Sequence, residues 1–281
     1  MDNPYRLTGP AVVSFSGGRT SGMMLHRIIQ AHGGTLPDDV LVCFANTGRE
    51  MPATLDFVRD CGAAWGVHIH WLEYRWAPGG PSFEIVSHNS ASRDGEPFRM
   101  LLDSKKMLPN PVARFCTIET KIRTQKRFLR SLGWDHWTSA VGLRADEPIR
   151  VARALDRERT KKDRWHNVCP LAAAGVTEED VFAFWRAQSF DLRLKGPWEG
   201  NCDGCFLKGR AALSRMWQDH PERMQWWVEQ EAVPRGAGRS ATFRADREDY
   251  ATMSRVIRDQ GTLPFDLDEA TLPCEDAACG V

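Results

Sequence analysis

Short apolar runs alternate with amphipathic stretches through the first part of the chain. Residues 11–15 and 40–45 are mostly apolar and residues 67–72 alternate, so each run is predicted to be a strand. Apolar positions recur at helical spacing from about residue 21 to 31 and from about residue 52 to 65. Strands and helices that alternate in this way predict an α/β, Rossmann-like parallel sheet with helices on both faces.

The pattern becomes less regular after residue 76. Residues 76–115 are rich in Pro, Gly and Asn, and they predict a long insertion with one short helix near residues 98–106. Further predicted elements are a helix over 117–132, a strand near 137–141, a basic helix around 147–160, a last strand at 167–171 and a helix that begins at Thr177.

Two regions of the chain differ in pattern. Residues 1–190 contain every predicted strand and form the expected sheet domain. Residues 191–281 show no strand pattern and are rich in Trp, Arg and Cys. We therefore expect a mostly helical, cysteine-containing C-terminal region after residue 190.

Composition and charge narrow the function classes. The 281 residues carry 37 Lys plus Arg and 37 Asp plus Glu, which excludes a globally basic nucleic-acid binder. No apolar run reaches about 18 residues and the N-terminus lacks a signal-peptide plan, so we expect no membrane segment and a cytoplasmic location. In that reducing compartment, eight cysteines indicate metal binding, redox chemistry or core packing rather than disulfides.

A glycine-rich segment between the first predicted strand and helix is the sharpest chemical feature. Its polar and glycine positions are Ser14, Ser16, Gly17, Gly18, Arg19, Thr20 and Ser21. Two adjacent glycines let backbone N–H groups approach an anion, the helix start adds partial positive charge, and hydroxyls add donors. No Gly-Lys-Ser/Thr follows, so this is not a Walker loop. The alternative is a plain glycine turn with a hydroxyl cap.

Cysteines in the C-terminal half suggest a metal site. Cys202 and Cys205 form a Cys-x-x-Cys on a turn, and two thiolates at this spacing can bind one metal centre. One pair does not complete a site, and Cys116 is a third candidate far away in the sequence. Zinc or a redox thiol pair are the alternatives to an iron–sulfur centre.

Basic and aromatic clusters leave further alternatives. Five basic residues crowd the helix after Cys116, namely Lys121, Arg123, Lys126, Arg127 and Arg130. They could bind sulfate, a nucleotide phosphate or a nucleic-acid backbone, or form a solvated helix face. Trp217, Trp226 and Trp227 could stack on bases, although packing in a helical core is the expected alternative.

The motifs together resemble a known family. The loop at Ser16–Ser21 resembles the PP-loop (Ser-Gly-Gly-x-Asp-Ser) of the adenine-nucleotide α-hydrolase superfamily, with Thr20 in place of the Asp. Three more segments resemble the branch named for phosphoadenosine phosphosulfate (PAPS) reductase, namely Phe44–Glu50, Cys116–Ile122 and Gly142–Glu147. The resemblance covers roughly residues 10–210.

This resemblance implies a nucleotide site in residues 1–190. The phosphates of ATP with Mg²⁺, or of an adenylated sulfate, would lie at the PP-loop. Asn46, Thr47 and Lys121 would contact the nucleotide. Arg144 could pair with a phosphate and Asp146 could hold Mg²⁺ or a hydroxyl, the alternative being a local ion pair between these two residues.

The same family includes members with a [4Fe-4S] cluster on a Cys-Cys pair and a later Cys-x-x-Cys. Cys116, Cys202 and Cys205 match three of these positions. The fourth position is open or belongs to Cys169, Cys274 or Cys279. Cys279, in a terminal Cys-Gly, also weakly resembles the nucleophilic cysteine of the reductases.

Three functions are compatible with these motifs. The leading expectation is an enzyme that cleaves ATP to AMP and pyrophosphate, adenylylates an acceptor such as a nucleic acid, and supports sulfur transfer with a cysteine desulfurase as a candidate partner. The second is a sulfonucleotide reductase in which Cys279 attacks sulfur and thioredoxin reduces the product. The third is a nucleotide- or cluster-binding subunit without catalysis. Each could act as a homo-oligomer.

Overall fold

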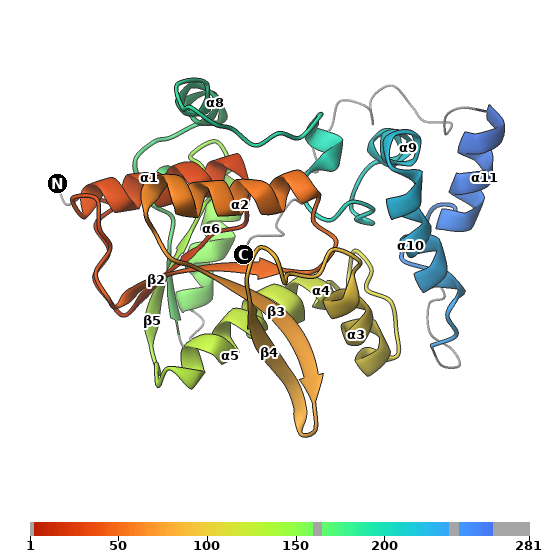
Figure 1. Ribbon diagram of the computed structural model, residues 1–281, viewed down its shortest axis with the longest axis horizontal. Coiled ribbons are helices and arrows are strands. Elements are labelled where there is room, and N and C mark those ends of the chain that lie inside the picture. Colours follow the sequence, from red (N-terminus) through yellow and green to blue (C-terminus); the bar gives the residue numbers. More distant parts are fainter. Residues whose placement is uncertain (1–2, 160–164, 236–241, 261–281) are drawn as a thin grey trace.

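A six-stranded sheet forms the centre of the computed structural model, which describes residues 3–159, 165–235 and 242–260 (Figure 1). Its strands are β1 (Ala11–Ser14), β2 (Val40–Asn46), β3 (Ile69–Ala77), β4 (Gly80–Val86), β5 (Trp137–Val141) and β6 (Trp165–Val168). The strand order is β4-β3-β2-β1-β5-β6, and only β4 runs antiparallel to its neighbour among these strands. The central position of β1 places its carboxyl end in the middle of the sheet edge, where ligands of such sheets bind.

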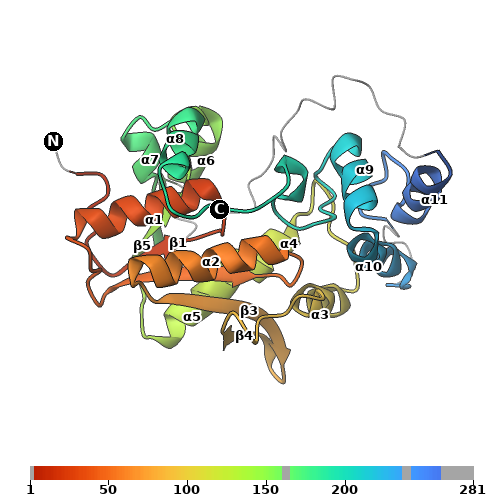
Figure 2. The ribbon, with the colours of Figure 1, turned by 45° about the horizontal axis from the view of Figure 1, so that its top comes forward.

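Helices cover both faces of this sheet, as the sequence predicted. The described α-helices are α1 (Arg19–Ala31), α2 (Pro52–Trp65), α3 (Glu96–Lys105), α4 (Phe115–Thr117), α5 (Thr124–Ser131), α6 (Pro148–Arg159), α7 (Pro170–Ala173), α8 (Glu178–Arg186), α9 (Arg210–Asp219), α10 (Pro221–Ala232) and α11 (Tyr250–Gln260). Helices α1 and α2 lie on one face and α5 lies on the other (Figures 1 and 2).

Alternation along β1 explains these two layers. Ala11 and Val13 belong to the core shared with α1 and α2, whereas Val12 packs with Phe128 and Leu129 on the α5 side. All three β1 residues have 0% exposure, so β1 is buried on both faces. Strands in this position are continuously apolar, which is why residues 11–15 could be recognised from the sequence.

The predicted insertion at residues 76–115 contains more regular structure than expected. Strand β3 extends to Ala77 and turns directly into β4, which pairs antiparallel with it. Gly79 and Gly80 adopt φ values of +105° and +118° in this turn, a conformation that glycine adopts without steric cost. Pro81 is tolerated because β4 is an edge strand. The sheet is therefore mostly parallel, as predicted, and gains one antiparallel edge strand that the sequence did not indicate.

Two further boundaries differ from the sequence prediction. Strand β6 ends at Val168, and Pro170 begins the short helix α7 instead of continuing the predicted strand 167–171. Proline lacks the N–H that a strand would use and suits the first helical turn. The predicted helix 117–132 is present as α4, a π-helical segment η1 (Ile118–Arg123) and α5.

The C-terminal region has a core of its own, built with α3. Helices α9, α10 and α11 gather beside α3 at one end of the molecule (Figure 2). Trp217, Trp226 and Trp227 are 6%, 6% and 1% exposed in this second core, so they are core residues rather than base-stacking platforms. Because Phe98 and Leu102 of α3 belong to the same core, it draws residues from both sides of the predicted boundary at residue 190. No described helix is both long and apolar enough to span a bilayer.

Candidate functional site

The loop between β1 and α1 has the backbone of an anion-binding turn. Gly17 has a φ of +77°, and a Cβ at this position would lie 2.8 Å from Cγ2 of Thr54. Both facts require glycine. Gly18 precedes α1 in an extended conformation, and no side chain caps the helix. The first N–H groups of α1 are therefore not taken by a capping side chain.

Two serine hydroxyls brace the same loop. The Oγ atoms of Ser16 and Ser21 lie 2.9 Å apart. Ser21 Oγ also accepts from the Ser16 amide at 3.2 Å and donates to the Gly18 carbonyl at 3.0 Å. These bonds fix the curvature of the loop before any ligand is present.

The loop forms one wall of a hollow, here named the anion hollow. All seven predicted loop positions, Ser14, Ser16, Gly17, Gly18, Arg19, Thr20 and Ser21, line it. The charged side chains that line it from other elements are Glu50, Lys121, Arg144, Glu147 and Arg150. The anion hollow thus combines a hydroxyl- and amide-rich loop with cations and two carboxylates.

Lys121 joins this hollow to the carboxylate of Glu50. Its Nζ lies 3.6 Å from Glu50 Oε1. Glu50 is 3% exposed and accepts from the Thr47 amide at 2.9 Å and the Thr47 hydroxyl at 2.8 Å. Lys121 lies in the π-helical segment η1, and π-helical turns are frequent at functional sites.

A second hollow, here named the aromatic hollow, adjoins the first. It shares Ser14, Ser16, Lys121 and Val141 with the anion hollow. The residues that line it alone include Phe15, Cys43, Ile122, Gln125, Lys126, Trp137, Ser139, Trp165 and Asn167. It therefore offers apolar and aromatic surface next to the cationic and hydroxyl groups of its neighbour.

Trp137 and Trp165 give the aromatic hollow a flat wall. Their rings stack with centroids 5.5 Å apart and planes 14° apart, and Lys126 Nζ lies 5.6 Å from the Trp165 ring centroid. The same hollow also has polar groups. Ser14 Oγ lies 3.4 Å from Gln125 Oε1 and 3.4 Å from Ser139 Oγ. A flat, partly polar ring is the kind of group that such a surface can hold.

Asn46 and Thr47 support the site without lining either hollow. The Asn46 amide donates to Glu73 Oε1 at 2.6 Å and to the Ser92 carbonyl at 2.8 Å, and its oxygen accepts from the Gly48 amide at 3.1 Å. With 0% exposure, Asn46 is a buried brace for the end of β2. Asn46 and Thr47 thus position the loop that carries Glu50, and their direct contact with a nucleotide stays a prediction.

Arg19 is engaged elsewhere. Its guanidinium donates twice to Asp191, at 2.7 and 2.9 Å, and to the Leu192 carbonyl at 2.7 Å. Arg19 lines the anion hollow, but its guanidinium charge is paired with Asp191, in the segment that leads to the C-terminal region.

Arg144 and Asp146 form a local ion pair, and their predicted roles toward a phosphate or Mg²⁺ stay predictions. Arg144 Nε lies 2.8 Å from Asp146 Oδ1, and Asp146 Oδ2 accepts from the Glu178 amide at 3.0 Å. Burial alone would raise the pKa of Asp146, but these bonds hold it below its ordinary value. Arg144 lines the anion hollow, whereas Glu147 rather than Asp146 supplies the carboxylate there.

The predicted cluster cysteines occupy the second core. Cys202 and Cys205 are 8% and 6% exposed within it, and Cys116 packs against it. No three His, Cys, Asp or Glu side chains gather as a metal site within residues 3–159, 165–235 and 242–260. Cys169 lies in a separate small core, where burial raises its pKa to about 11. Cys274 and Cys279 lie outside the described residues.

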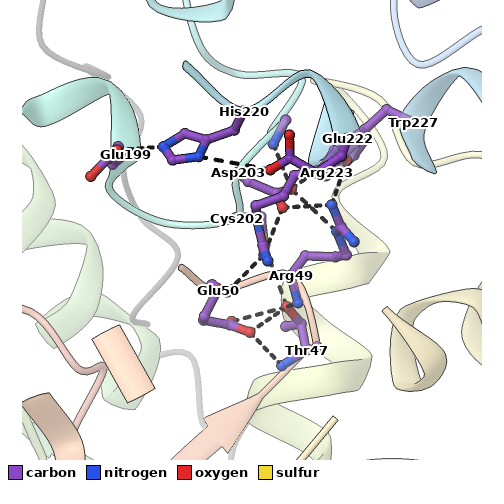
Figure 3. Close-up of polar contacts among 12 residues, drawn as sticks. Thr47, Arg49, Glu50, Glu199, Cys202, Asp203, His220, Glu222, Arg223 and Trp227 are labelled. Carbon is purple, nitrogen blue, oxygen red and sulfur yellow. Dashed lines mark hydrogen bonds and ion pairs between the residues drawn. The ribbon is translucent and has the colours of Figure 1, made fainter. Parts of the chain in front are cut away.

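A buried ion network joins the C-terminal region to the site (Figure 3). Asp203 has 0% exposure, and its carboxylate lies 2.5 Å from Arg49 and 2.8 Å from Arg223. Arg223 also donates to the Glu50 carbonyl at 2.9 Å, and Trp227 donates to Asp203 at 2.8 Å. Burial lowers the pKa of Arg49, and Asp203 opposes that shift.

Sequence reasoning missed several residues of the two hollows. Glu50 and Glu147 stand at the ends of segments that were recognised as motifs, so their position was a usable signal. Trp137 and Trp165 begin neighbouring parallel strands, and only the register between β5 and β6 brings them together. That register has no local sequence signature.

A family model and a phage protein match most of this chain. A family model described as the phosphoadenosine phosphosulfate reductase domain matches residues 10–193. The uncharacterized nin region protein ORF290 of Escherichia phage lambda is 29% identical over 214 residues, which is 74% of this chain and 69% of that protein.

Two solved structures are similar in outline. One is PAPS reductase from Candida auris in a phosphate complex, with 20% identity and a TM-score of 0.36, covering 66% of this chain and 72% of that one. The other is the U34-tRNA thiolase NcsA from Methanococcus maripaludis with its [4Fe-4S] cluster, with 15% identity and a TM-score of 0.40, covering 79% and 73%.

Proposed function

This chain belongs to the phosphoadenosine phosphosulfate reductase domain family, and from that premise we propose that it binds an adenine nucleotide across both hollows and cleaves ATP to AMP and pyrophosphate. The observation that carries the proposal is the continuity of the two hollows, which share Ser14, Ser16, Lys121 and Val141. A flat base joined to a chain of phosphates suits this arrangement, because the base matches the aromatic hollow and the anionic phosphates match the anion hollow.

The anion hollow supplies groups that stabilise a departing pyrophosphate. Free N–H groups at the start of α1 and the loop hydroxyls donate to phosphate oxygens, and Lys121 adds a full positive charge. In the reaction, a nucleophile on the acceptor bonds to the α-phosphorus as the bond from that phosphorus to the bridging oxygen breaks. The acceptor then carries AMP, and pyrophosphate leaves with the electron pair.

Mg²⁺ would enter as part of the nucleotide substrate. Magnesium in such sites is held by one or two carboxylates together with phosphate oxygens. Glu50 and Glu147 are the carboxylates that line the anion hollow, so they take the role that the sequence assigned to Asp146. Thr20 offers a hydroxyl where many ATP-using relatives have an aspartate.

A second candidate, favoured by the family match itself, is a sulfonucleotide reductase. In that reaction the Cys279 thiolate bonds to the sulfur of the adenylated sulfate as the sulfur–oxygen bond to the nucleotide breaks. Thioredoxin dithiol then reduces the resulting thiosulfonate, which releases sulfite and the free cysteine. A third candidate binds nucleotide without turnover.

The [4Fe-4S] cluster stays a prediction from the sequence. The cysteines of the described residues do not by themselves form a three-ligand group, so no step of the proposed reaction depends on a cluster. Partners such as a nucleic-acid acceptor, a cysteine desulfurase or a second copy of the chain likewise remain predictions.

One set of assays separates the three candidates. Purified protein is titrated with ATP and Mg²⁺ in a calorimeter, and then incubated with ATP plus a nucleic-acid acceptor or with adenylyl sulfate plus thioredoxin. Pyrophosphate and AMP from ATP support the first function, sulfite from adenylyl sulfate supports the second, and binding without either product supports the third. Absence of nucleotide binding, in protein that melts cooperatively, contradicts all three.

A further inference from the structure

Asn201 reaches the anion hollow from the C-terminal region. It lines that hollow directly before the buried Cys202. Its φ is +58°, and Lys106 is the other non-glycine residue with positive φ in the described part of the chain. Asn adopts positive φ more readily than most other non-glycine residues, so residue 201 suits this turn.

Interactions on both sides of the site loop fix this turn. Glu50 and Cys202 form an isolated antiparallel β-bridge, and the Asp203 amide donates to the Arg49 carbonyl at 2.9 Å. The Asp203 carboxylate is then held by Arg49 and Arg223. Asn201 therefore directly precedes Cys202 and Asp203, whose contacts with Glu50 and Arg49 dock the C-terminal region against the site loop; Figure 3 shows these four residues.

The chemistry of Asn201 suits an anionic ligand. A carboxamide offers two N–H donors without a charge of its own. The described residues provide no hydrogen-bond partner for this side chain, and Asn201 lines the same hollow as Lys121, Ser16 and Ser21. We propose that the Asn201 carboxamide donates to a phosphate oxygen of the bound nucleotide, so that the C-terminal region supplies a substrate contact. This inference rests on the proposed nucleotide function.

The Asn201→Gly variant separates a ligand contact from a turn role. Glycine adopts a φ of +58° freely, so the turn and the melting temperature are maintained or improved. The affinity for inorganic pyrophosphate with Mg²⁺ is expected to fall about tenfold or more, the range for a hydrogen bond to a charged group. Asn201→Asp keeps the turn but replaces a donor with a negative charge, and it is expected to weaken binding further.

Lys106→Gly is the matched control. It removes a side chain from the other positive-φ position, with φ 52° at the end of α3 and outside both hollows, and should leave pyrophosphate affinity unchanged. If the unmodified protein binds no pyrophosphate, the proposed function itself fails. If it binds pyrophosphate and the Asn201→Gly variant binds equally well, Asn201 is only a turn residue and the inference is overturned.

Discussion

Lys121 Nζ and Glu50 Oε1 lie 3.6 Å apart at the anion hollow, although they come from a π-helical segment and from the loop after β2. Their side chains are 17% and 3% exposed, so the carboxylate is the buried partner that fixes the position of the cation. Thr47 holds the Glu50 carboxylate in turn through its amide and hydroxyl. The cation at the site thus depends on the second-strand motif.

Replacing Lys121 should weaken phosphate binding specifically. Lys121→Met keeps most of the stem and removes the charge, and a charge-assisted contact to phosphate is worth about 1.5–3 kcal/mol, or roughly 10–100-fold in affinity. Calorimetric titration with ATP and Mg²⁺ measures the change. Arg255→Met removes an exposed cation of α11 that lines neither hollow, so it should leave the affinity unchanged. If both variants bind ATP with the same affinity, Lys121 does not contact the phosphates.

The loop glycine should be irreplaceable for reasons of both strain and space. Gly17→Ala forces φ +77° on alanine and places a methyl group 2.8 Å from Thr54, so we expect a loss of about 2 kcal/mol or more in the free energy of unfolding. Nucleotide affinity should fall with it. Denaturant unfolding and calorimetry measure the two effects.

Gly33→Ala is the control for strain alone. Gly33 has φ +74°, but a Cβ there meets nothing within 4 Å. It should cost about 1 kcal/mol of stability and leave nucleotide affinity unchanged. If the two alanine variants bind ATP equally, the loop at Gly17 does not hold phosphates.

Local patterns made the centre of this site predictable. Ser16, Gly17 and Ser21 lie close together in the sequence and line the anion hollow together, so strand, glycine turn and helix start could be recognised as one unit. Buried strands such as β1 are recognisable for the same reason, since every position is apolar. The Cys-x-x-Cys and the second-strand motif were recognised as segments, but not the contacts between them.

Long-range pairing was not predictable from these patterns. The sequence assigned nucleotide contact to Asn46 because it ends a strand, but only the fold shows that Glu73 and Ser92 occupy its amide. The ion pair of Arg19 with Asp191 likewise joins distant segments. Strand β4 was missed because half-exposed edge strands lack a continuous apolar run.

Replacing one of the stacked tryptophans should weaken the binding of the base without weakening the binding of the phosphates. Trp165→Ala removes a flat wall of the aromatic hollow, and stacking on a base is worth about 1–3 kcal/mol. We therefore expect AMP affinity to fall by roughly 10–100-fold while pyrophosphate affinity stays constant. Trp134→Ala, at a partly buried tryptophan that lines neither hollow, is the control. A parallel loss of both ligands would mean that Trp165 supports the fold rather than a base.

Glu119 should make stability depend on pH in the acid range. It is 2% exposed and lies 3.0 Å from Lys105, 2.7 Å from Arg123 and 3.1 Å from Arg127. Burial alone would raise its pKa, but these cations lower it below the ordinary value of 4.5. The contribution of Glu119 to the free energy of unfolding is therefore complete above pH 4.5. It is lost as the pH falls through the lower pKa of the folded state.

Glu119→Gln removes this contribution. We expect a loss of about 1–3 kcal/mol at neutral pH and a flatter stability profile below the ordinary glutamate pKa, measured by urea unfolding across pH. Asp135→Asn changes an exposed ion pair with Arg130 and should shift stability by less than about 1 kcal/mol. A Glu119→Gln profile parallel to that of the unmodified protein would show that the carboxylate carries no pH-linked stability.

The sequence-based cluster prediction has a direct chemical test. Protein purified without oxygen should contain about four iron and four sulfide per chain and absorb in the visible range. Cys202→Ala and Cys205→Ala should lose that iron. Because both side chains also pack in the second core, the melting temperature is needed to separate lost iron from lost packing. Cys43→Ala, in the core beneath α5, lowers stability through packing alone and should retain the iron. Iron-free protein, or zinc in its place, would contradict the cluster and leave Cys202 and Cys205 as core residues, with Cys202 bridged to Glu50.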